Sequence, residues 1–514
     1  MPARGLDPGG RAPILGPMPT APSTPCRTLG PILRLRGADE RVARLAVTLA
    51  LPPGVGPPTL AAGETRPAPE RLGALAGLEF WSWSFEAPLG RGDAYVLGGA
   101  PHAFQLPEAG GALRIAYASC NGGEDEAKAS SLPGGRDAMW RHLLARHEAE
   151  PFHLLLMGGD QIYADALWDL PSMRAWGRLG RRAREASPFT DEMRVELEAH
   201  YLATYAGVFG APDVAAVLAR VPSVMMWDDH DIVDGWGSRP ASWQASPVAR
   251  GLFAAARRAF ALVQLGCDPD ALPLGFAAPD GAHFGWAATY GAARIVMPDL
   301  RSERTRRRVM GPRGTADLGR AMEVPASHLL MVSSVPLVNA DLSAVERLVA
   351  PLTAVADLYQ DDLRDQWMSH AHLAEWRALM ERLLDQAATG RRVTVLSGEI
   401  HFGARGTAER DAAALEQLTA SGIAHPPPPP ILARVLEGRV RRPWRRGGLR
   451  LAMHPLWSGG PRYLAERNWL EVTARPGGAL AAVLHGERSG AVPLAAHDAM
   501  ADRGSLNDRT MPVA

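Results

Sequence analysis

The sequence predicts a layered α/β fold that is preceded by a small all-β domain. In the first part, residues 80–85 read Phe-Trp-Ser-Trp-Ser-Phe, and this alternation of bulky and small side chains at period two is typical of a strand. From Leu113 onward, apolar runs of strand length alternate with segments whose apolar residues recur at helical spacing. We therefore expect a β-rich domain at 29–110 and an α/β domain at 111–514.

Each expected element rests on one of these two patterns. The head of the chain, residues 1–28, is rich in Pro and Gly and is expected to be flexible. Apolar and β-favouring residues over 32–51 predict the first strands. In the α/β domain we expect strands at 113–118, 152–157, 221–227, 294–297, 329–332 and 392–396, helices at 136–148, 192–219, 246–265 and 373–388, and a final hairpin at 469–484.

The composition is that of an ordinary globular protein, because 46% of the 514 residues are hydrophobic and 21% are charged. Lys+Arg and Asp+Glu balance at 55 each, so no overall field attracts nucleic acid or an anionic membrane. The arginine-rich stretch 439–450 lacks interleaved aromatic residues apart from Trp444, which disfavours a nucleic-acid partner. The three cysteines are too few and too widely spaced for a disulfide framework.

Two further features bear on location. The N-terminus lacks the basic segment and continuous apolar core of a secretory signal, and no apolar run reaches membrane-spanning length. We therefore expect a soluble, cytoplasmic protein without a transmembrane segment. The sequence leaves the oligomeric state open.

Four of the predicted strands end in residues that can bind metal. Because the carboxyl ends of parallel strands meet at one edge of a sheet, we expect these residues to converge. Gathered carboxylates and imidazoles favour a multivalent cation such as iron, zinc, manganese, magnesium or calcium. A carboxylate that bridges two ions suits phosphoryl transfer, so hydrolysis of phosphate esters is the leading chemistry. The four ends carry Cys120, then Asp160 with Tyr163 and Asp165, then residues 228–231, and finally Glu399 with His401.

These strand ends resemble, in order, the signatures of the PhoD-like alkaline phosphatases within the calcineurin-like metallophosphoesterase superfamily. Residues 299–304 and 418–422 resemble two further family patterns. The resemblance covers roughly 113–422 and implies a metallophosphoesterase-like layered β-sandwich flanked by helices, with the small β domain in front. The matching stretches are Ser-Cys-Asn at 119–121, Gly-Asp-Gln-Ile-Tyr-Ala-Asp at 159–165, Trp-Asp-Asp-His-Asp at 227–231 and Ser-Gly-Glu-Ile-His-Phe at 397–402.

The resemblance implies a centre with two or more metal ions. Asp160 would bridge the ions, and Tyr163 would bind ferric iron as a phenolate with Cys120 beside the same ion. Asp229 stands where the wider superfamily has an Asn. Fe3+ and Ca2+ are favoured, with Mn2+, Zn2+ or Mg2+ as alternatives. The implied ligands are Cys120, Asp160, Tyr163, Asp229, Glu399 and His401.

Two catalytic residues are implied beside the metal ligands. His230 would protonate the leaving group or stabilise charge, and Arg301 would clamp phosphate oxygens in bidentate fashion. The expected reaction is attack of a metal-bound hydroxide on a small phosphorylated substrate, either a monoester or a diester. Asp228, Asp231 and Asp234 could orient ligands instead of binding metal.

The chain departs from the family pattern at two points. Glu399 replaces the usual Asp at the last strand end, and residues 331–336 contain no His where the wider superfamily has a metal-binding one. These departures motivate the alternative of a catalytically silent PhoD-like protein that binds phosphorylated ligands without turnover. His425, beside the proline run 426–430, could reach the site, but a position in a surface loop is favoured.

Overall fold

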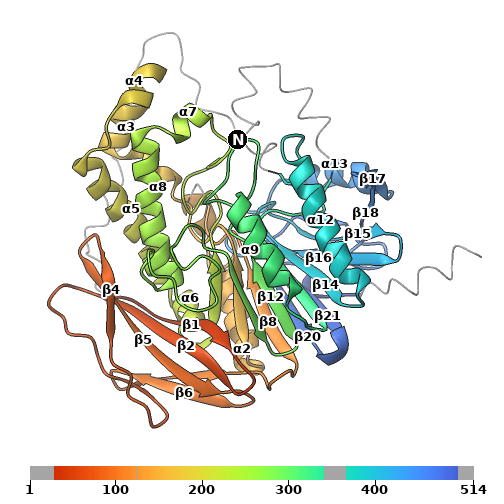
Figure 1. Cartoon of the computed structure of the whole chain (residues 1–514), viewed down its shortest axis with the longest axis horizontal. Coiled ribbons are helices and arrows are strands. Elements are labelled where there is room, and N and C mark those ends of the chain that lie inside the picture. Colours follow the sequence, from red (N-terminus) through yellow and green to blue (C-terminus); the bar gives the residue numbers. More distant parts are fainter. Residues whose placement is uncertain (1–27, 124–125, 341–365, 496–514) are drawn as a thin grey trace, which may run out of the picture.

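Two large β-sheets form the centre of the protein in the computed structural model, which describes residues 28–123, 126–340 and 366–495 (Figure 1). The first sheet has ten strands, of which the central four run parallel to one another. Their order is β22 (Gly490–Leu494), β21 (Leu480–Gly486), β20 (Asn468–Ala474), β8 (Leu113–Ala118), β9 (Leu154–Gly158), β10 (Ser223–Met226), β1 (Leu29–Ala38), β2 (Val42–Leu51), β5 (Leu78–Pro88) and β4 (Glu70–Leu75).

The second sheet has nine strands. Their order is β11 (Trp286–Tyr290), β12 (Ala293–Met297), β13 (His328–Ser333), β14 (Arg392–Ser397), β16 (Ala413–Thr419), β15 (Gly403–Arg410), β18 (Leu449–Met453) and β17 (Trp444–Arg446), with β19 (Tyr463–Leu464) paired to β15. From β12 to β16 the neighbouring strands run parallel. A small third sheet contains β3 (Leu60–Ala62), β6 (Gly92–Leu97) and β7 (Ala100–Gln105).

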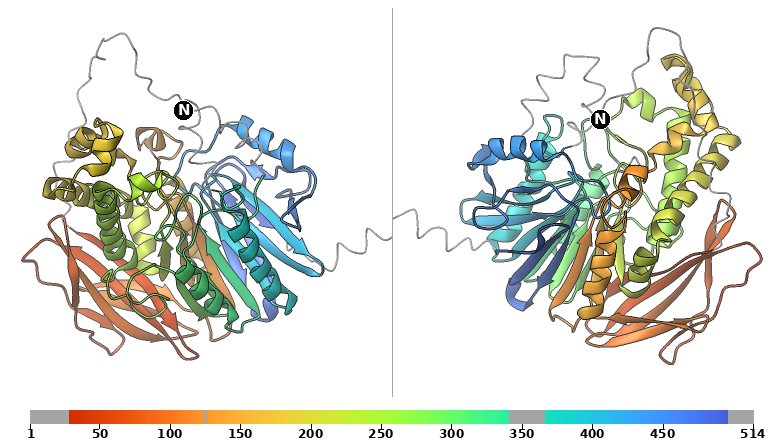
Figure 2. Two further views of the ribbon diagram at one scale, coloured as in Figure 1. Left: turned by 45° about the horizontal axis from the view of Figure 1, so that its top comes forward. Right: turned by 180° about the vertical axis from the view of Figure 1, so that it is seen from behind.

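Helices cover the outer faces of both large sheets, so the predicted layered α/β fold is confirmed (Figure 2). The nine-stranded sheet packs against α9 (Pro312–Glu323) and α12 (Leu373–Ala388). The ten-stranded sheet packs against α2 (Ala138–Ala149), α5 (Asp191–Phe209) and α6 (Pro212–Arg220), and α8 (Pro247–Phe260) packs on α5. The shorter helices are α1 (Glu126–Ser130), η1 (Asp165–Asp169), α3 (Pro171–Gly177), α4 (Arg181–Ala186), α7 (Ala241–Gln244), η2 (Ala261–Leu265), α13 (Pro430–Val440) and η3 (Pro476–Gly478).

Both faces of strand β9 are buried, which explains why the apolar run before the two glycines is uninterrupted. Leu154 and Leu156 belong to the hydrophobic core between the two sheets. Leu155 and Met157 belong to the second core, between the ten-stranded sheet and its helices. All four side chains are fully buried, as expected for a parallel strand that is covered on both faces. The run therefore fixes β9 in the middle of the fold, with its carboxyl end at one edge.

The N-terminal strands are confirmed, and they extend the main sheet. Strand β1 pairs in parallel with β10, at Arg34 and Ser223, so the ten-stranded sheet runs through both predicted domains. Arg34 also donates a hydrogen bond of 2.9 Å to the carbonyl of Gln264, and Arg36 donates to the carbonyl of Leu265 at 2.7 Å. These bonds satisfy carbonyls at the end of η2. The boundary at 110 stays a prediction, and residues 1–27 lie outside the described part.

The predicted helical stretch 192–219 is divided into α5 and α6. The two helices meet at a bend of 85°, where Gly210 ends the first and Pro212 begins the second. By length and composition alone, the two helices taken together are as long and apolar as a membrane span, although the bend divides them. In the described ranges, no single helix is long and apolar enough to cross a bilayer.

Glu471 on β20 provides a first testable prediction, on stability. Its carboxylate accepts hydrogen bonds from Arg114 at 2.8 and 2.9 Å and pairs with His485 at 3.2 Å. Burial alone would raise the pKa of Glu471, but the hydrogen bonds from His485 and Arg114 outweigh it and lower the pKa from 4.5 to about 2. The folded state therefore binds fewer protons than the unfolded state between these values.

The stability that this carboxylate contributes is fully present above pH 4.5 and is lost as the pH falls toward 2. We expect Glu471→Gln to lower the free energy of unfolding at pH 7 by up to about 3 kcal/mol. The difference from the wild type should shrink as the pH falls below 4.5. Urea unfolding at several pH values measures both effects, and Glu323→Gln, at an exposed position, is the control. A difference that is independent of pH would contradict the prediction.

Candidate metal centre

The predicted strand ends do converge at one edge of the fold. Strands β8, β9 and β10 are neighbours in the ten-stranded sheet, and β13, β14 and β16 are neighbours in the nine-stranded sheet. The two sheets are joined at this edge, because the hydroxyl of Ser119 donates to the carbonyl of Ala420 at 3.0 Å. The amide of Ile423 also donates to the carbonyl of Ser119 at 3.1 Å. The residues that follow β8, β9, β14 and β16 therefore face one another.

The backbone is unusual at the same positions. Cys120, Asp160, Glu399 and His401 have φ values of 53°, 53°, 63° and 54°. A non-glycine residue rarely adopts a positive φ, and such conformations cluster at functional sites, where the surrounding structure enforces them. In the described part of the chain, Ala76 and Asp411 are the other non-glycine residues of this kind. Unusual backbone thus coincides with four of the predicted metal ligands.

Cys120, Asp160 and Tyr163 lie together, as predicted. The Cys120 Sγ atom is 3.5 Å from Asp160 Oδ2 and 3.1 Å from the hydroxyl of Ser421, and the phenol group of Tyr163 lies beside the thiol. Burial raises the pKa of Cys120, and the nearby charge of Asp160 adds to the effect. The Oδ1 atom of Asp160 is buried and has no hydrogen-bond partner among the residues that the structure describes.

Three carboxylates are crowded beside this group. One oxygen from each of Asp160, Asp228 and Asp229 lies within 4.8 Å of the others, and all three residues are buried. Burial raises the pKa of Asp160 well above its ordinary value, and the charge of Asp228 raises it further. Buried like charges at this spacing are costly without a compensating cation. The sequence did not predict Asp228 as a ligand, although it adjoins Asp229.

A close backbone approach holds the carboxylates in place. Gly159 has a φ of 99°, and a Cβ atom at this position would lie 2.8 Å from the Cβ atoms of both Asp228 and Ser334. Only glycine fits there, so the glycine before Asp160 allows the two sheets to meet. Ser334 stands at the end of β13, in the stretch where the superfamily histidine is missing, and its small side chain suits this contact.

Arg301 lies at the site, buried beside two of the carboxylates. Its side chain is fully buried, and its Nε atom donates to Asp228 Oδ1. Its remaining donors bond Asp229 Oδ1 and the carbonyl of Trp236, each at 3.1 Å. A guanidinium bound in this way holds the two carboxylates in place. Its predicted role as a clamp on phosphate oxygens stays a prediction.

His230 also lies at the site, and Asp165 orients it. Its Nδ1 atom is 2.6 Å from Asp165 Oδ2, and the ring centroid lies 4.3 Å from that of Tyr163. Burial lowers the pKa of His230, but the charge and hydrogen bond of Asp165 outweigh burial and raise the pKa well above its ordinary value. His230, Asp229 and Asp234 form a second group whose donor atoms lie within 4.8 Å.

Asp231 has an orienting role, which was one of the two alternatives. Its carboxylate accepts hydrogen bonds from the amides of Gln161 at 3.1 Å, Ile162 at 3.2 Å and Asp228 at 2.9 Å. Gln264 donates to the same carboxylate at 2.8 Å. The carboxylate therefore ties the loop after β9 to the loop after β10.

Glu399 and His401 lie at the same edge, outside the two groups just described. The side-chain amide of Gln366 donates to both carboxylate oxygens of Glu399, at 3.0 and 3.1 Å. The His401 amide donates to the Ser421 hydroxyl at 2.9 Å, and its ring stacks on that of His425 with centroids 3.6 Å apart.

His425 lies beside the cluster, which was the less favoured of the two alternatives drawn from the sequence. Its amide donates to the carbonyl of Cys120 at 3.2 Å, which fixes the residue beside the cluster. The ring centroid is 5.4 Å from that of Tyr163. The only sequence signal for His425 at the site was the nearby family-like pattern at 418–422. That pattern ends three residues before His425, and the predicted site was not extended beyond it.

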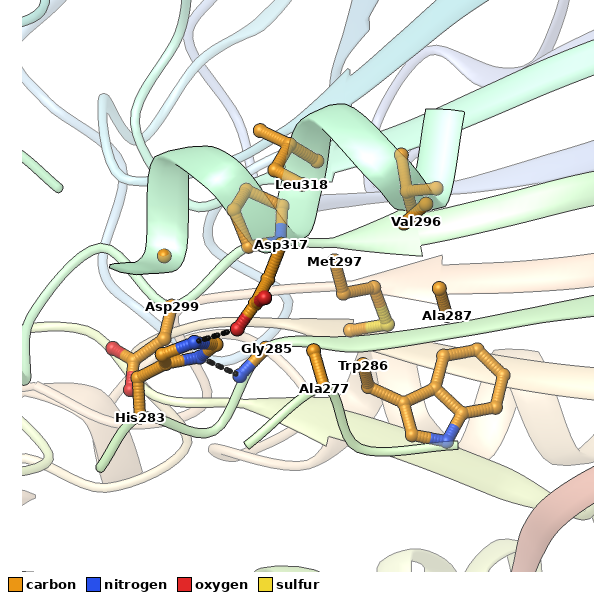
Figure 3. Close-up of a pocket in the computed structure, with 13 residues that line it drawn as sticks. Ala277, His283, Gly285, Trp286, Ala287, Val296, Met297, Asp299, Asp317 and Leu318 are labelled. Atoms are coloured by element: carbon orange, nitrogen blue, oxygen red, sulfur yellow. Dashed lines mark hydrogen bonds and ion pairs between the residues drawn. The ribbon is translucent and has the colours of Figure 1, made fainter. Parts of the chain in front are cut away.

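A small cavity lies near β11, β12 and α9 (Figure 3). Its volume of about 20 Å³ is enough for roughly one water molecule. His283 and Asp317 pair beside it at 2.8 Å, and His283 Nδ1 accepts a hydrogen bond from the amide of Gly285. Asp299, on the same wall, accepts from the indole of Trp227 and from the amide of Arg301, both at 2.9 Å. This cavity is too small for a substrate and belongs to the support of the Arg301 loop.

Comparisons with known proteins agree with this geometry. Residues 114–357 match the model of a family described as PhoD related phosphatase. An uncharacterized protein of Saccharomyces cerevisiae, YGR266W, is 24% identical to this chain over the matched region. The match covers 64% of this chain and 58% of the yeast protein, so the chain spans less than two thirds of that relative's length. A solved structure described as "Structure of PhoD" superposes with a TM-score of 0.56 at 14% identity, covering 93% of this chain and 94% of that one. The resemblance to PhoD-like phosphatases and the predicted fold class are thereby confirmed.

Proposed function

We propose that this PhoD-like chain is a metal-dependent hydrolase of phosphoric esters. The observation that carries the proposal is the group of Asp160, Asp228 and Asp229, whose buried oxygens lie within 4.8 Å of one another beside Cys120 and Tyr163. Buried carboxylates at this spacing repel one another, and a multivalent cation removes the repulsion. Phosphate esters are the substrates that such centres commonly cleave.

The residues present fit the metal ions that the fold family implies. Asp160 offers an oxygen without a hydrogen-bond partner among the described residues, as a bridging ligand would. Cys120 and Tyr163 supply a thiolate and a phenolate for a ferric ion, and Asp229, Glu399 and His401 supply the harder donors that calcium, manganese, magnesium or zinc accepts. When bound, the ions supply Lewis acidity and neutralise phosphate charge.

Side chains of the protein transfer the proton and position the other groups. A water molecule attacks phosphorus while the bond to the leaving alcohol breaks, and His230 gives a proton from its Nε2 atom to the departing oxygen. The proton that the attacking water releases restores the charged form of His230. Asp165 bonds the opposite nitrogen, Nδ1, at 2.6 Å and so orients the ring for this transfer. Arg301 is a positioning residue, which fixes Asp228 and Asp229. The substrate is a small phosphorylated molecule, and the metal identities and the preference for monoesters or diesters are part of the test.

Metal removal tests the proposal directly. We expect the metal-loaded protein to hydrolyse p-nitrophenyl phosphate, bis-p-nitrophenyl phosphate or both. Dialysis against a chelator should lower the rate by about a hundredfold or more, because the crowded carboxylates cannot act without their cations. Reloading with iron and calcium, or with manganese, zinc or magnesium singly, should restore the rate and identify the active metals.

The competing function is binding of phosphorylated ligands without turnover. It is favoured by the pairing of Glu399 with Gln366 and by the serine at position 334. A metal-loaded protein that binds inorganic phosphate by calorimetry but hydrolyses neither ester would establish this function. The same result would overturn the hydrolase proposal.

A further inference from the structure

A large cavity adjoins the metal centre. Its volume is about 730 Å³, and it lies between α5 and the chain segment that leads into α2. This volume is within the range of small-molecule sites, and it is far larger than a phosphate group needs. Its lining includes Arg136 and Asp137 before α2, Tyr163, and His200, Thr204 and Gly207 on α5.

Tyr163 connects this cavity with the centre. Its ring lines the cavity, while His230 and His425 approach it with centroids 4.3 and 5.4 Å away. Gly123, also in the lining, is close to His425, since a Cβ atom on the glycine would lie 3.6 Å from the imidazole. A substrate whose phosphate lies at the carboxylates can therefore extend past Tyr163 into the cavity.

A buried arginine holds the wall of the cavity that lies opposite α5. The fully buried Arg467 donates to the carbonyls of Pro133 and Gly135, each at 2.7 Å, and to that of Arg136 at 3.0 Å. Glu487 pairs with the Arg467 guanidinium and balances its charge. A wall held by a buried, charge-balanced arginine keeps its shape when a ligand enters.

The lining carries polar groups without an excess of charge. Arg136 pairs with Asp137 at 2.8 Å, so the two charges compensate each other. The His200 Nε2 atom is 2.9 Å from the carbonyl of Ala164. Much of the remaining lining on α5 is small, with Ala203, Thr204 and Gly207 on one face. Walls of this kind suit a ligand that contains a ring with hydroxyl or carbonyl groups. Among the described lining residues there is no cluster of cationic side chains that would bind a second phosphate.

We propose that this cavity binds the leaving group of the substrate, and that this group is an uncharged alcohol with one or two rings, such as an aryl alcohol or a nucleoside. The inference rests on the proposed function, which places the phosphate at the neighbouring centre. It assigns the selectivity for the alcohol to α5 and the segment before α2.

Gly207 permits a clean test. It lies inside α5, and a Cβ atom built on it meets no atom within 4 Å, so a larger side chain enters the cavity without a clash. Gly438 is a matched control, because it lies inside α13, also meets nothing within 4 Å and is absent from the lining. Substituting either exposed helical glycine also removes an unfavourable residue from a helix.

The experiment compares wild type, Gly207→Phe and Gly438→Phe on methylumbelliferyl phosphate, whose leaving group has two rings, and on β-glycerol phosphate. In Gly207→Phe the ratio of kcat/KM for the first ester to that for the second is expected to fall by about tenfold or more. Gly438→Phe should keep the ratio of the wild type. An unchanged ratio in Gly207→Phe, with thermal unfolding confirming an intact fold, would overturn the inference.

Binding of free methylumbelliferone, followed by its fluorescence, separates this inference from the proposed function. The expected result is about tenfold weaker binding to Gly207→Phe than to wild type and to Gly438→Phe. This loss supports the cavity as a ring site even if no ester is hydrolysed, in which case the hydrolase proposal alone has failed. Equal binding to all three proteins would overturn the cavity assignment while leaving the hydrolase proposal intact.

Discussion

Asp160→Asn is expected to lower the rate of p-nitrophenyl phosphate hydrolysis by about a thousandfold or more, which corresponds to about 4 kcal/mol of lost transition-state stabilisation. Asp160 lies beside Cys120 and also belongs to the group of three buried carboxylates. It is 3.5 Å from Cys120 and shares a group of buried oxygens with Asp228 and Asp229. An amide keeps the shape of the side chain but removes the negative charge and one anionic ligand atom. Metal content, measured by elemental analysis, should fall together with the rate.

The same substitution is expected to stabilise the metal-free protein. Three buried carboxylates within 4.8 Å repel one another without a cation, and the amide relieves part of this repulsion. Urea unfolding of the chelated proteins should therefore show a higher free energy of unfolding for Asp160→Asn than for wild type. Asp191→Asn, on the exposed start of α5, is the control and should change neither activity nor metal content. A fully active Asp160→Asn protein would show that the centre is misplaced.

Much of the centre could be predicted because parallel strands impose its location. The buried run 154–157 identified a central strand, and the residue types after 118, 158, 226 and 397 identified strand ends that share an edge. Strand pairing then brings Cys120 and Asp160 together without any knowledge of side-chain positions, since their loops exchange main-chain hydrogen bonds. The ligand roles themselves stay predictions.

The features that were missed depend on tertiary contacts. His425 directly precedes a proline run in the sequence, and the hydrogen bond from its amide to the carbonyl of Cys120 brings it to the cluster. Strand β1 begins a segment that reads as a separate β domain, yet it joins β10 through pairing between residues 34 and 223. A pattern along the chain reports periodicity and local composition, so it could not reveal either of these long-range pairings.

Arg301→Met is expected to lower the free energy of unfolding by about 3–5 kcal/mol, because it leaves buried carboxylates without their guanidinium partner. Arg301 is fully buried and bonds Asp228, Asp229 and the carbonyl of Trp236. Arg301→Lys should recover little of the loss, since one ammonium group cannot span three acceptors arranged around a planar fork. The exposed pair of Arg313 with Asp280, at 2.6 Å, is a matched control, and Arg313→Met should change the free energy of unfolding far less than Arg301→Met does.

Kinetics of the Arg301 variants distinguish a positioning residue from a phosphate clamp. A positioning role predicts reduced metal content and a lower kcat, because Asp229 is a proposed ligand and loses the 3.1 Å bond that orients it. A clamp on the substrate predicts a raised KM with unfolding and metal content unchanged. Urea unfolding, elemental analysis and p-nitrophenyl phosphate kinetics on the same samples separate the two outcomes. A raised KM with unchanged unfolding and metal content would mean that the guanidinium turns from its buried carboxylates toward the substrate. It would support the phosphate clamp that was predicted from the sequence.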